Sequence, residues 1–283
     1  VERLVTFPIE TAVNGATNVR RVRSSSTTGF SVVWVEFDWN TDIYLDRQIV
    51  SEKLSTVSGS LPDNVSQPVL GPQSSILGEV LIVGLTADST SMLDLRTIAD
   101  WTVRPRLLST GGVAQVAVLG GDIKEYQILI HPDRMKHYGV SLSEVMAATR
   151  GMNQNTSGGV IYQYGNEYIV RGMVSSDDVD KLAQSALRTS SGTTVTLSDV
   201  ADVRIGAQQP KLGVASVKGK PAVLLTVTKQ PNTGTIELTE KLEEAVKDLK
   251  KNMPADVHVS TDIFRQANFI NSSIDNVQES LIE

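Results

Sequence analysis

Few residues of the 283-residue chain have the types and spacing that catalysis requires. The sequence contains no GxSxG, GxGxxG, Walker A or HExxH motif, so the usual patterns of a nucleophile elbow, a nucleotide-binding loop and a zinc hydrolase are missing. There is also no cysteine, which excludes disulfides, thiolate nucleophiles and zinc sites built on cysteine. We therefore expect a protein that is not an enzyme and that carries no cofactor.

The three histidines and six methionines do not form a metal-site pattern. His131, His137 and His258 are scattered, and no pair has the i, i+4 or HxH spacing that would place two imidazoles on one ion. No two methionines form an MxxM-type pair, and Met146 falls within an amphipathic stripe, where core packing explains it. Surface histidines and core methionines are the simpler interpretation.

One carboxylate stands out. Glu79 is a charge at the start of an otherwise apolar strand, directly after the connection from Gly71 to Gly78. Burying this charge without a partner would be costly, so Glu79 either reaches solvent from the strand end or has a functional role. Other carboxylates lie on the polar sides of predicted helices, where a solvated face is the normal explanation: Asp177, Asp178, Glu240, Glu243 and Glu244.

The composition favours sheets covered by helices and divided among two or three compact units. Hydrophobic residues make up 40% of the chain and aromatic residues only 5%, so the cores must consist mainly of Val, Leu and Ile. The net charge of -6 and the lack of a basic cluster with interleaved aromatics argue against nucleic acid and against an anionic membrane surface. No stretch approaches the roughly 18 to 20 apolar residues of a membrane-spanning helix.

The first 70 residues predict the order αββαβ. A helix with Leu4, Val5, Ile9 and Ala12 on one face ends near Gly15, with Pro8 as a kink. Strands over 19–24 and 30–38 are joined by the Ser/Thr/Gly run 24–29. Asp42 caps a helix whose buried stripe is Leu45, Ile49, Leu54 and Val57, and a strand over 65–70 follows.

A second unit begins after the Gly71-Pro72 break. The apolar run 78–85 predicts an interior strand, and a helix over 93–108 and a strand over 113–119 complete a βαβ element. Residues 222–228 predict another interior strand, followed by a helix with its buried face at Leu238, Leu242, Ala245, Val246 and Leu249. The passage Met253-Pro254 to Val257 echoes Leu61-Pro62 to Val65, which indicates an internal repeat of ferredoxin-like, split βαβ units.

Between these parts lies a further α+β segment. We expect a strand from Lys124, a helix from Leu142 with a capping box of Ser141 and Glu144, and a hairpin around Tyr164-Gly165-Asn166. A helix with the stripe Val179, Leu182, Ala183 and Ala186 and strands over 193–197 and 200–205 follow. The final residues, from Phe264 to Leu281, predict an amphipathic helix that either docks on its own core or continues further.

Several strings in order along the chain resemble the first periplasmic loop of the RND efflux transporters, in the heavy-metal, CusA/CzcA-like branch. They are Leu4 to Ala12 (LVTFPIETA), Thr41 to Tyr44 with Arg47-Gln48, Leu70-Gly71-Pro72, Leu77-Gly78-Glu79, Gly120-Gly121 with Lys124 to Gln127, and Tyr138 to Ser141. Since the chain has no initiator Met and opens inside a helix, we expect an excised segment that lacks an initial strand.

The resemblance implies an α+β fold of repeated ferredoxin-like split βαβ subdomains, called porter units, with an inserted α+β docking subdomain. Residues 1–72 would be the first porter subdomain, residues 73–121 and 220–262 the second, and residues 122–219 the docking subdomain, with a hairpin arm near 158–171. Residues 263–283 would form a helix leading toward the membrane.

The resemblance also implies a function: the periplasmic portion of a proton-driven, bacterial inner-membrane pump that exports heavy-metal cations. Such pumps are homotrimers that work with a periplasmic adaptor protein and an outer-membrane channel. Glu79 matches a position where zinc-type members have a carboxylate beside the substrate path. At Gln115, where a carboxylate is common in the family, this chain has an amide, which leaves the metal open.

Two alternatives stay open. An RND exporter of hydrophobic drugs would favour a Phe-rich pocket, and the chain has only 5 Phe. A free-standing periplasmic binding or assembly module would need a complete first strand and a normal start.

Overall fold

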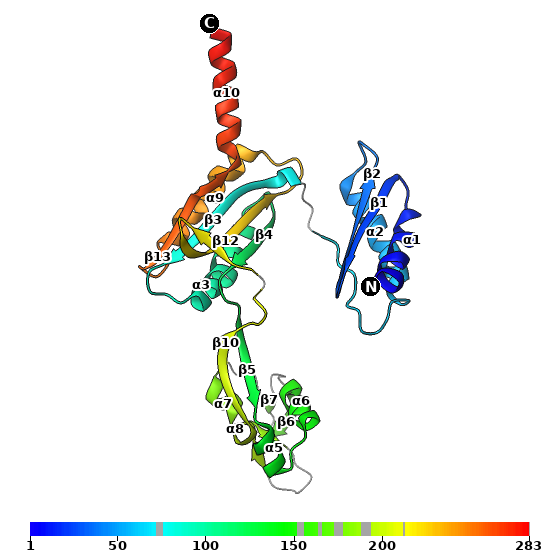
Figure 1. Cartoon of the computed structure of the whole chain (residues 1–283), viewed down its shortest axis with the longest axis vertical. Coiled ribbons are helices and arrows are strands. Elements are labelled where there is room, and N and C mark those ends of the chain that lie inside the picture. The colour runs from blue at the N-terminus through cyan, green and yellow to red at the C-terminus, as the bar shows by residue number, and fades with distance from the viewer. Residues whose placement is uncertain are drawn as a thin grey trace. The chain divides into compact units, whose positions relative to one another are not determined.

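The computed structural model describes residues 1–71, 76–151, 156–163, 166–172, 178–187, 194–211 and 213–282 (Figure 1). The chain divides into two compact units, Val1–Gln73 and Ser74–Glu283. The predicted α+β class is confirmed, because both units combine helices with antiparallel strands.

The first unit is a helical layer on a two-stranded hairpin. A π-helical turn, η1 (Glu2–Thr6), leads into α1 (Phe7–Asn14), which has Pro8 in its first turn. The strands β1 (Val19–Thr27) and β2 (Phe30–Phe37) pair antiparallel, and α2 (Ile43–Ser58) follows. The described core consists of Ile9, Val13 and Val50, with Val5, Val22, Val33, Val35, Phe37, Leu54, Val57 and Leu70 packed around them.

The predicted loop over residues 24–29 is too long. Ser24 to Thr27 continue β1, so that the turn is confined to Thr28 and Gly29. The Oγ1 atom of the buried Thr6 lies 2.7 Å from the hydroxyls of both Ser26 and Ser31, which face each other across the hairpin. These contacts satisfy the hydroxyl of Ser26, which the sequence pattern assigned to a loop.

Asp42 caps α2 as predicted, since its side chain accepts a hydrogen bond from the Tyr44 amide. The predicted stripe is wrong at its first position, because Leu45 is 53% exposed. Asp46 is buried instead, at 3% exposure, and accepts a hydrogen bond of 2.6 Å from the Thr41 hydroxyl. The predicted stripe holds at Leu54 and Val57, which pack on the core, and the buried Asp46 carboxylate is tolerated because it is hydrogen-bonded.

The strand predicted over residues 65–70 is absent, and this segment has no ladder partner among the described residues. In a ferredoxin-like sheet the strand order is 4-1-3-2, so the fourth strand pairs only with the first. No described strand of this unit occupies the first position, and Pro68 has no N–H to donate. A strand needs a neighbour, which a local pattern cannot supply.

The second unit contains the split βαβ fold in full. Its sheet has the order β13-β3-β12-β4 with every neighbouring pair antiparallel, formed by β3 (Glu79–Ala87), β4 (Val113–Gly120), β12 (Lys220–Lys229) and β13 (Val257–Arg265). Because β12 is antiparallel to both β3 and β4, these two strands run parallel with β12 between them. A short strand, β11 (Ala215–Val217), forms a hairpin with β12.

Helices pack on one face of this sheet. The predicted helix over 93–108 is one continuous run of α3 (Met92–Ile98), a π-helical segment η3 (Ala99–Val103) and α4 (Arg104–Leu108). The other helix is α9 (Thr235–Lys250), whose five predicted buried residues are all buried. Leu95, Val103, Leu107, Leu238 and Leu242 are at most 1% exposed and pack on Leu81, Val83, Leu85, Leu225 and Val227 of the strands.

The segment between β4 and β11 has its own core. It is framed by an antiparallel pair of β5 (Lys124–Ile130) and β10 (Ala201–Ala207). The remaining elements are α5 (Pro132–Tyr138), α6 (Leu142–Gly151), β6 (Thr156–Gln163), β7 (Asn166–Gly172), α7 (Val179–Ala183), β8 (Ala186–Leu187), β9 (Val195–Thr196) and α8 (Leu197–Val200). The described core includes Met135, Val140, Val145, Leu187, Val195, Leu197, Val200 and Ala201.

The predictions for this segment are confirmed in part. Ser141 and Glu144 form the expected capping box, with the Ser141 amide and hydroxyl each donating to Glu144 at 2.7 Å. The sequence pattern missed α5, and Ala186 belongs to β8 rather than to the preceding helix. Strands β6 and β7 pair as a hairpin, while Tyr164 and Gly165 of its predicted turn lie outside the described residues.

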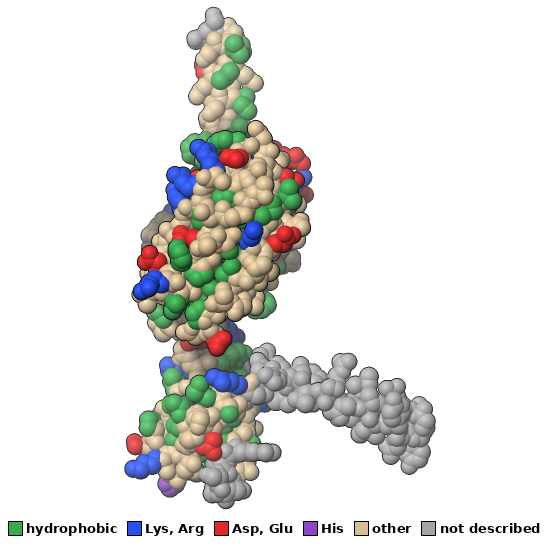
Figure 2. Space-filling model, turned by 90° about the vertical axis from the view of Figure 1, so that its right-hand side faces the viewer, with side chains coloured by type: hydrophobic (Ala, Val, Ile, Leu, Met, Phe, Trp, Pro, Cys, Tyr) green, Lys and Arg blue, Asp and Glu red, His purple; other side chains and the backbone are tan. Residues whose placement is uncertain are grey.

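The chain ends in α10 (Gln266–Ile282), which follows β13 directly. Ala267 is the one buried residue of this helix, and Figure 2 shows hydrophobic side chains along its length. Among the helices of the described ranges, none is both long and apolar enough to cross a membrane.

Candidate functional site

Glu79 is the first residue of β3, where the short 3-10 turn η2 (Ile76–Gly78) enters the sheet. It is exposed, whereas Val80 and Leu81 directly after it are fully buried. The charge therefore lies at the boundary between the apolar core and solvent. The strand-end position is as the sequence predicted, and a role in the substrate path stays a prediction.

The sheet brings Glu79 into one row with two other polar residues. Thr228 on the central strand β12 lies opposite Glu79 on β3 and opposite Gln115 on β4. A register shift between Val227 and Thr228 creates the first of these pairings. Residues directly opposite one another point to the same face of a sheet with Cβ atoms about 5 Å apart, so the row spans roughly 10 Å.

The face that carries this row differs from the helix-covered face. By alternation along β12, Thr228 shares its face with Thr226 and Leu224, which are half-buried, while Val227 and Leu225 face the helices. On β4, Leu119 of the same face is 48% exposed. The row thus lies on the side of the sheet that the helices leave open.

None of the three side chains has a hydrogen bond or ion pair within the described part of the chain. Thr228 is 8% exposed, and its hydroxyl is not one of the fully buried unpaired atoms of the described residues, so it keeps access to solvent. A carboxylate, a hydroxyl and an amide carbonyl are oxygen donors suited to a divalent cation. The sequence pattern singled out Glu79 and Gln115, but Thr228 was missed because its place depends on the bulge.

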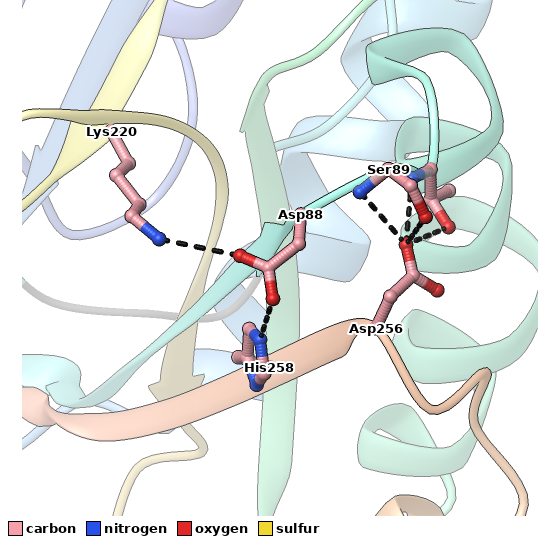
Figure 3. A network of polar contacts seen from close by, with 6 residues as sticks. Asp88, Ser89, Lys220, Asp256 and His258 are labelled. Atoms are coloured by element: carbon pink, nitrogen blue, oxygen red, sulfur yellow. Dashed lines mark hydrogen bonds and ion pairs between the residues drawn. The ribbon is translucent and has the colours of Figure 1, made fainter.

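A second polar group lies at the other end of β3 (Figure 3). One oxygen of Asp256 accepts four hydrogen bonds of 2.6–3.1 Å, from the backbone amides and hydroxyls of Ser89 and Thr90. These donors hold the pKa of Asp256 well below its ordinary value, because they favour the ionised form. This cluster fastens the start of β13 to the loop after β3.

Asp88 in the same group lies 2.8 Å from Nε2 of His258 and 3.3 Å from Nζ of Lys220. The hydrogen bonds from His258 and Lys220 lower the pKa of Asp88. All three side chains are more than half exposed, so the contacts give little stability and leave no enclosed site. A structural role explains the cluster.

The remaining histidines and methionines form no cluster in the described part of the chain. His131 lies 2.8 Å from Asp202, whose pKa it lowers, and His137 packs edge-on against Tyr138. The described residues contain no group of three or more His, Asp or Glu that could hold a metal. Met146 is 45% exposed, so the expectation that it packs in the core is wrong; its neighbour Val145 is the buried residue on α6.

Two of the carboxylates assigned to solvated helix faces have partners. Glu243 on α9 forms a two-point ion pair with Arg265, and Asp178 caps α7 by accepting a hydrogen bond from the Asp180 amide. Glu240 and Glu244 are exposed as predicted, and Asp177 lies outside the described residues.

Comparison with known proteins places these features in a family. The model of the AcrB/AcrD/AcrF family matches residues 1–283. The chain is 31% identical to the protein HelA of Legionella pneumophila over 290 residues, 32% identical to the cation efflux system protein CzcA of Alcaligenes sp. (strain CT14) over 293 residues, and 33% identical to the cation efflux system protein CusA of Escherichia coli (strain K12) over 287 residues. Each match covers 100% of this chain and 27% of the relative.

Solved structures agree with the sequence matches. An X-ray structure of a heavy metal efflux pump, in its crystal form II, superposes on the whole chain with a TM-score of 0.89 and 26% identity, and the chain covers 28% of it. Crystal form I gives a TM-score of 0.86 at the same identity. The expected resemblance to the heavy-metal branch is confirmed, and the chain belongs to the AcrB/AcrD/AcrF family of RND efflux transporters, spanning about a quarter of the length of its relatives.

Proposed function

We propose that the chain is the porter and docking portion of a proton-driven efflux pump that exports heavy-metal cations. The observation that carries this proposal is the row of Glu79, Thr228 and Gln115, three oxygen-bearing side chains without described partners on the open face of the sheet. The names of the relatives, which are cation efflux proteins, support the same substrate class. A transport role also fits the absence of catalytic motifs from the sequence.

Within this proposal, Glu79 provides the charge that attracts the cation, and the two neutral residues provide weaker oxygen ligands. A single carboxylate gives modest affinity, which suits a path through which the ion must also leave. A fully acidic ligand set would bind more tightly and release more slowly. The amide at Gln115 therefore favours release of the cation over tight binding. The identity of the metal stays open.

The chain's division follows the same proposal. Residues 1–72 would be a first porter subdomain, residues 73–121 and 220–262 a second, residues 122–219 a docking subdomain, and residues 263–283 a helix toward the membrane. The division of contacts after Gln73 and the four-stranded sheet assembled from residues on both sides of the insert support these boundaries. We further propose that the intact pump is a homotrimer of the bacterial inner membrane, with this portion in the periplasm. Its partners would be an adaptor protein and an outer-membrane channel.

The test is metal resistance of cells that express the full-length transporter. Glu79→Ala should lower resistance to at least one divalent cation by several-fold at unchanged expression, whereas Glu244→Ala, which removes an exposed carboxylate from α9, should not. Unchanged resistance in Glu79→Ala for every metal tried would remove this residue from the path. Resistance to hydrophobic dyes instead of metals would favour the drug-exporter alternative.

A further inference from the structure

The helix α10 is attached to the second unit only through its first turn. Of its residues from Gln266 to Ile282, Ala267 alone is buried, at 1% exposure. Large apolar side chains of the helix are exposed: Phe269 at 65%, Val277 at 59% and Leu281 at 81%. The helix packs against α9 and β3, and its first residue, Gln266, bonds both sides of this attachment.

Gln266 makes a bridge at this attachment. Its Nε2 donates a hydrogen bond of 3.0 Å to the backbone carbonyl of Leu77, and its Oε1 accepts one from the Thr235 hydroxyl at 3.4 Å. The Leu77 carbonyl can only accept, which fixes the NH₂ group of the amide toward it, and the Thr235 hydroxyl then serves as the donor to Oε1. Both ends of the Gln266 amide are thereby assigned.

The carbonyl that Gln266 holds belongs to the turn directly before Glu79. Leu77 is the middle residue of η2 (Ile76–Gly78), and Glu79 begins β3 immediately after this turn. On the neighbouring strand, Arg265 lies opposite Leu81, so that the last residue of β13 is beside the start of β3. One hydrogen bond therefore joins the root of α10 to Leu77, and Glu79 follows Leu77 by two residues.

We infer that Gln266 is a positioning residue that ties α10 to the turn before Glu79. A shift of the first turn of α10 then changes the position of the Glu79 carboxylate. The inference rests on the proposed function, in which Glu79 contacts the cation. Arg265 keeps the root itself in place, because it bonds Glu243 on α9 at 2.6 and 3.0 Å and Asn268 on α10 at 2.7 Å. With β13 and α9 fixed in this way, the Gln266 bond joins the root of α10 to η2.

The first arm of the test measures the turn itself in the full-length transporter by amide hydrogen exchange. Gln266→Glu keeps the size of the side chain but removes the donor and places a carboxylate against the Leu77 carbonyl. Exchange over residues 77–80 should become about three- to tenfold faster, as expected for loss of one hydrogen bond. Gln266→Lys restores a donor and should return exchange toward the wild-type rate, and Asn271→Ala, an exposed change on the same helix, should leave it unchanged.

The second arm measures cation transport by the same variants. If Gln266 acts through Glu79, then Gln266→Glu raises the half-saturating cation concentration several-fold, and it adds nothing further in a Glu79→Ala background. Gln266→Lys should recover most of the wild-type value, which a merely structural loss of stability would not explain.

The two arms separate the inference from the proposed function. Unchanged exchange over residues 77–80 in Gln266→Glu overturns the inference alone, whatever the transport result. Faster exchange with a fully additive transport defect also overturns it. Normal transport in Glu79→Ala overturns the proposed function, and the link to transport falls with it while the structural bond stands.

Discussion

Arg265 at the end of β13 donates two hydrogen bonds to the carboxylate of Glu243 on α9, from Nε to Oε1 at 2.6 Å and from Nη2 to Oε2 at 3.0 Å. These hydrogen bonds to Glu243 raise the pKa of Arg265. The side chains are 27% and 35% exposed, so solvent weakens the pair only in part. Glu243→Gln should lower the free energy of unfolding by about 1 kcal/mol, since it removes a charge-assisted contact. Denaturant unfolding measures this, and an equal loss in the exposed Glu244→Gln would contradict it.

Asp256 should make the stability depend on pH in the acid range. Its pKa is lowered in the folded chain by the hydrogen bonds of Ser89 and Thr90, so the stabilisation is fully present above the unfolded value of about 4 and is lost as the pH falls below it. At pH 7 the Asp256→Asn variant should have a lower thermal unfolding midpoint than the wild type. Below pH 5 its midpoint should fall less steeply with pH than that of the wild type. Thermal unfolding at a series of pH values tests this, and parallel curves for the two proteins would refute it.

Gly121, directly after β4, should not tolerate a side chain. It has φ of +69°, and an added Cβ would lie 2.8 Å from Cβ of Arg96 and 2.8 Å from Cγ2 of Val223. Gly121→Ala should cost about 2 to 4 kcal/mol, from backbone strain and the clash together. Gly139 has φ of +64° with open space around it, so Gly139→Ala should cost only about 1 kcal/mol. Equal losses in the two unfolding curves would count against this packing.

Truncating two leucines, each on a helix of similar length, should change the free energy of unfolding by very different amounts. Leu242 on α9 is fully buried, so Leu242→Ala should cost about 2 to 5 kcal/mol through the cavity it leaves. Leu281 on α10 is 81% exposed, so Leu281→Ala should change the unfolding free energy by less than about 0.5 kcal/mol. A large loss in Leu281→Ala would mean that α10 packs on the rest of this chain.

The sequence predicted best the elements whose cause is local. The buried face of α9, the cap at Asp42 and the capping box of Ser141 and Glu144 each depend on residues within one or two helical turns. The interior strand that starts at Glu79 was visible from its continuous apolar run. These predictions needed no knowledge of the rest of the chain.

The predictions of secondary structure failed where contacts between residues far apart in the sequence determine it. The segment 65–70 is strand-like in composition but lacks a neighbour, and Ser24 to Thr27 join a strand because Phe30 to Val33 lie opposite. Asp46 is a local exception, because the Thr41 hydroxyl five residues earlier hydrogen-bonds its carboxylate and a stripe of apolar residues alone does not include it.

The candidate site was predicted in part for the same reason. Glu79 and Gln115 were identified singly, through a strand-end charge and a family position. Thr228 between them required the register of β12 against both neighbours, including the shift after Val227. Gln266 gave no signal, because its partner Leu77 is 189 residues away in the sequence.

The most direct measurement is calorimetric titration of divalent cations into the full-length transporter, with and without Glu79→Ala. We expect saturable binding of at least one cation, weakened about tenfold or more by Glu79→Ala and tightened by Gln115→Glu, which adds a second carboxylate to the row. Identical binding by the wild type and both variants would show that the cation does not contact this row of the sheet.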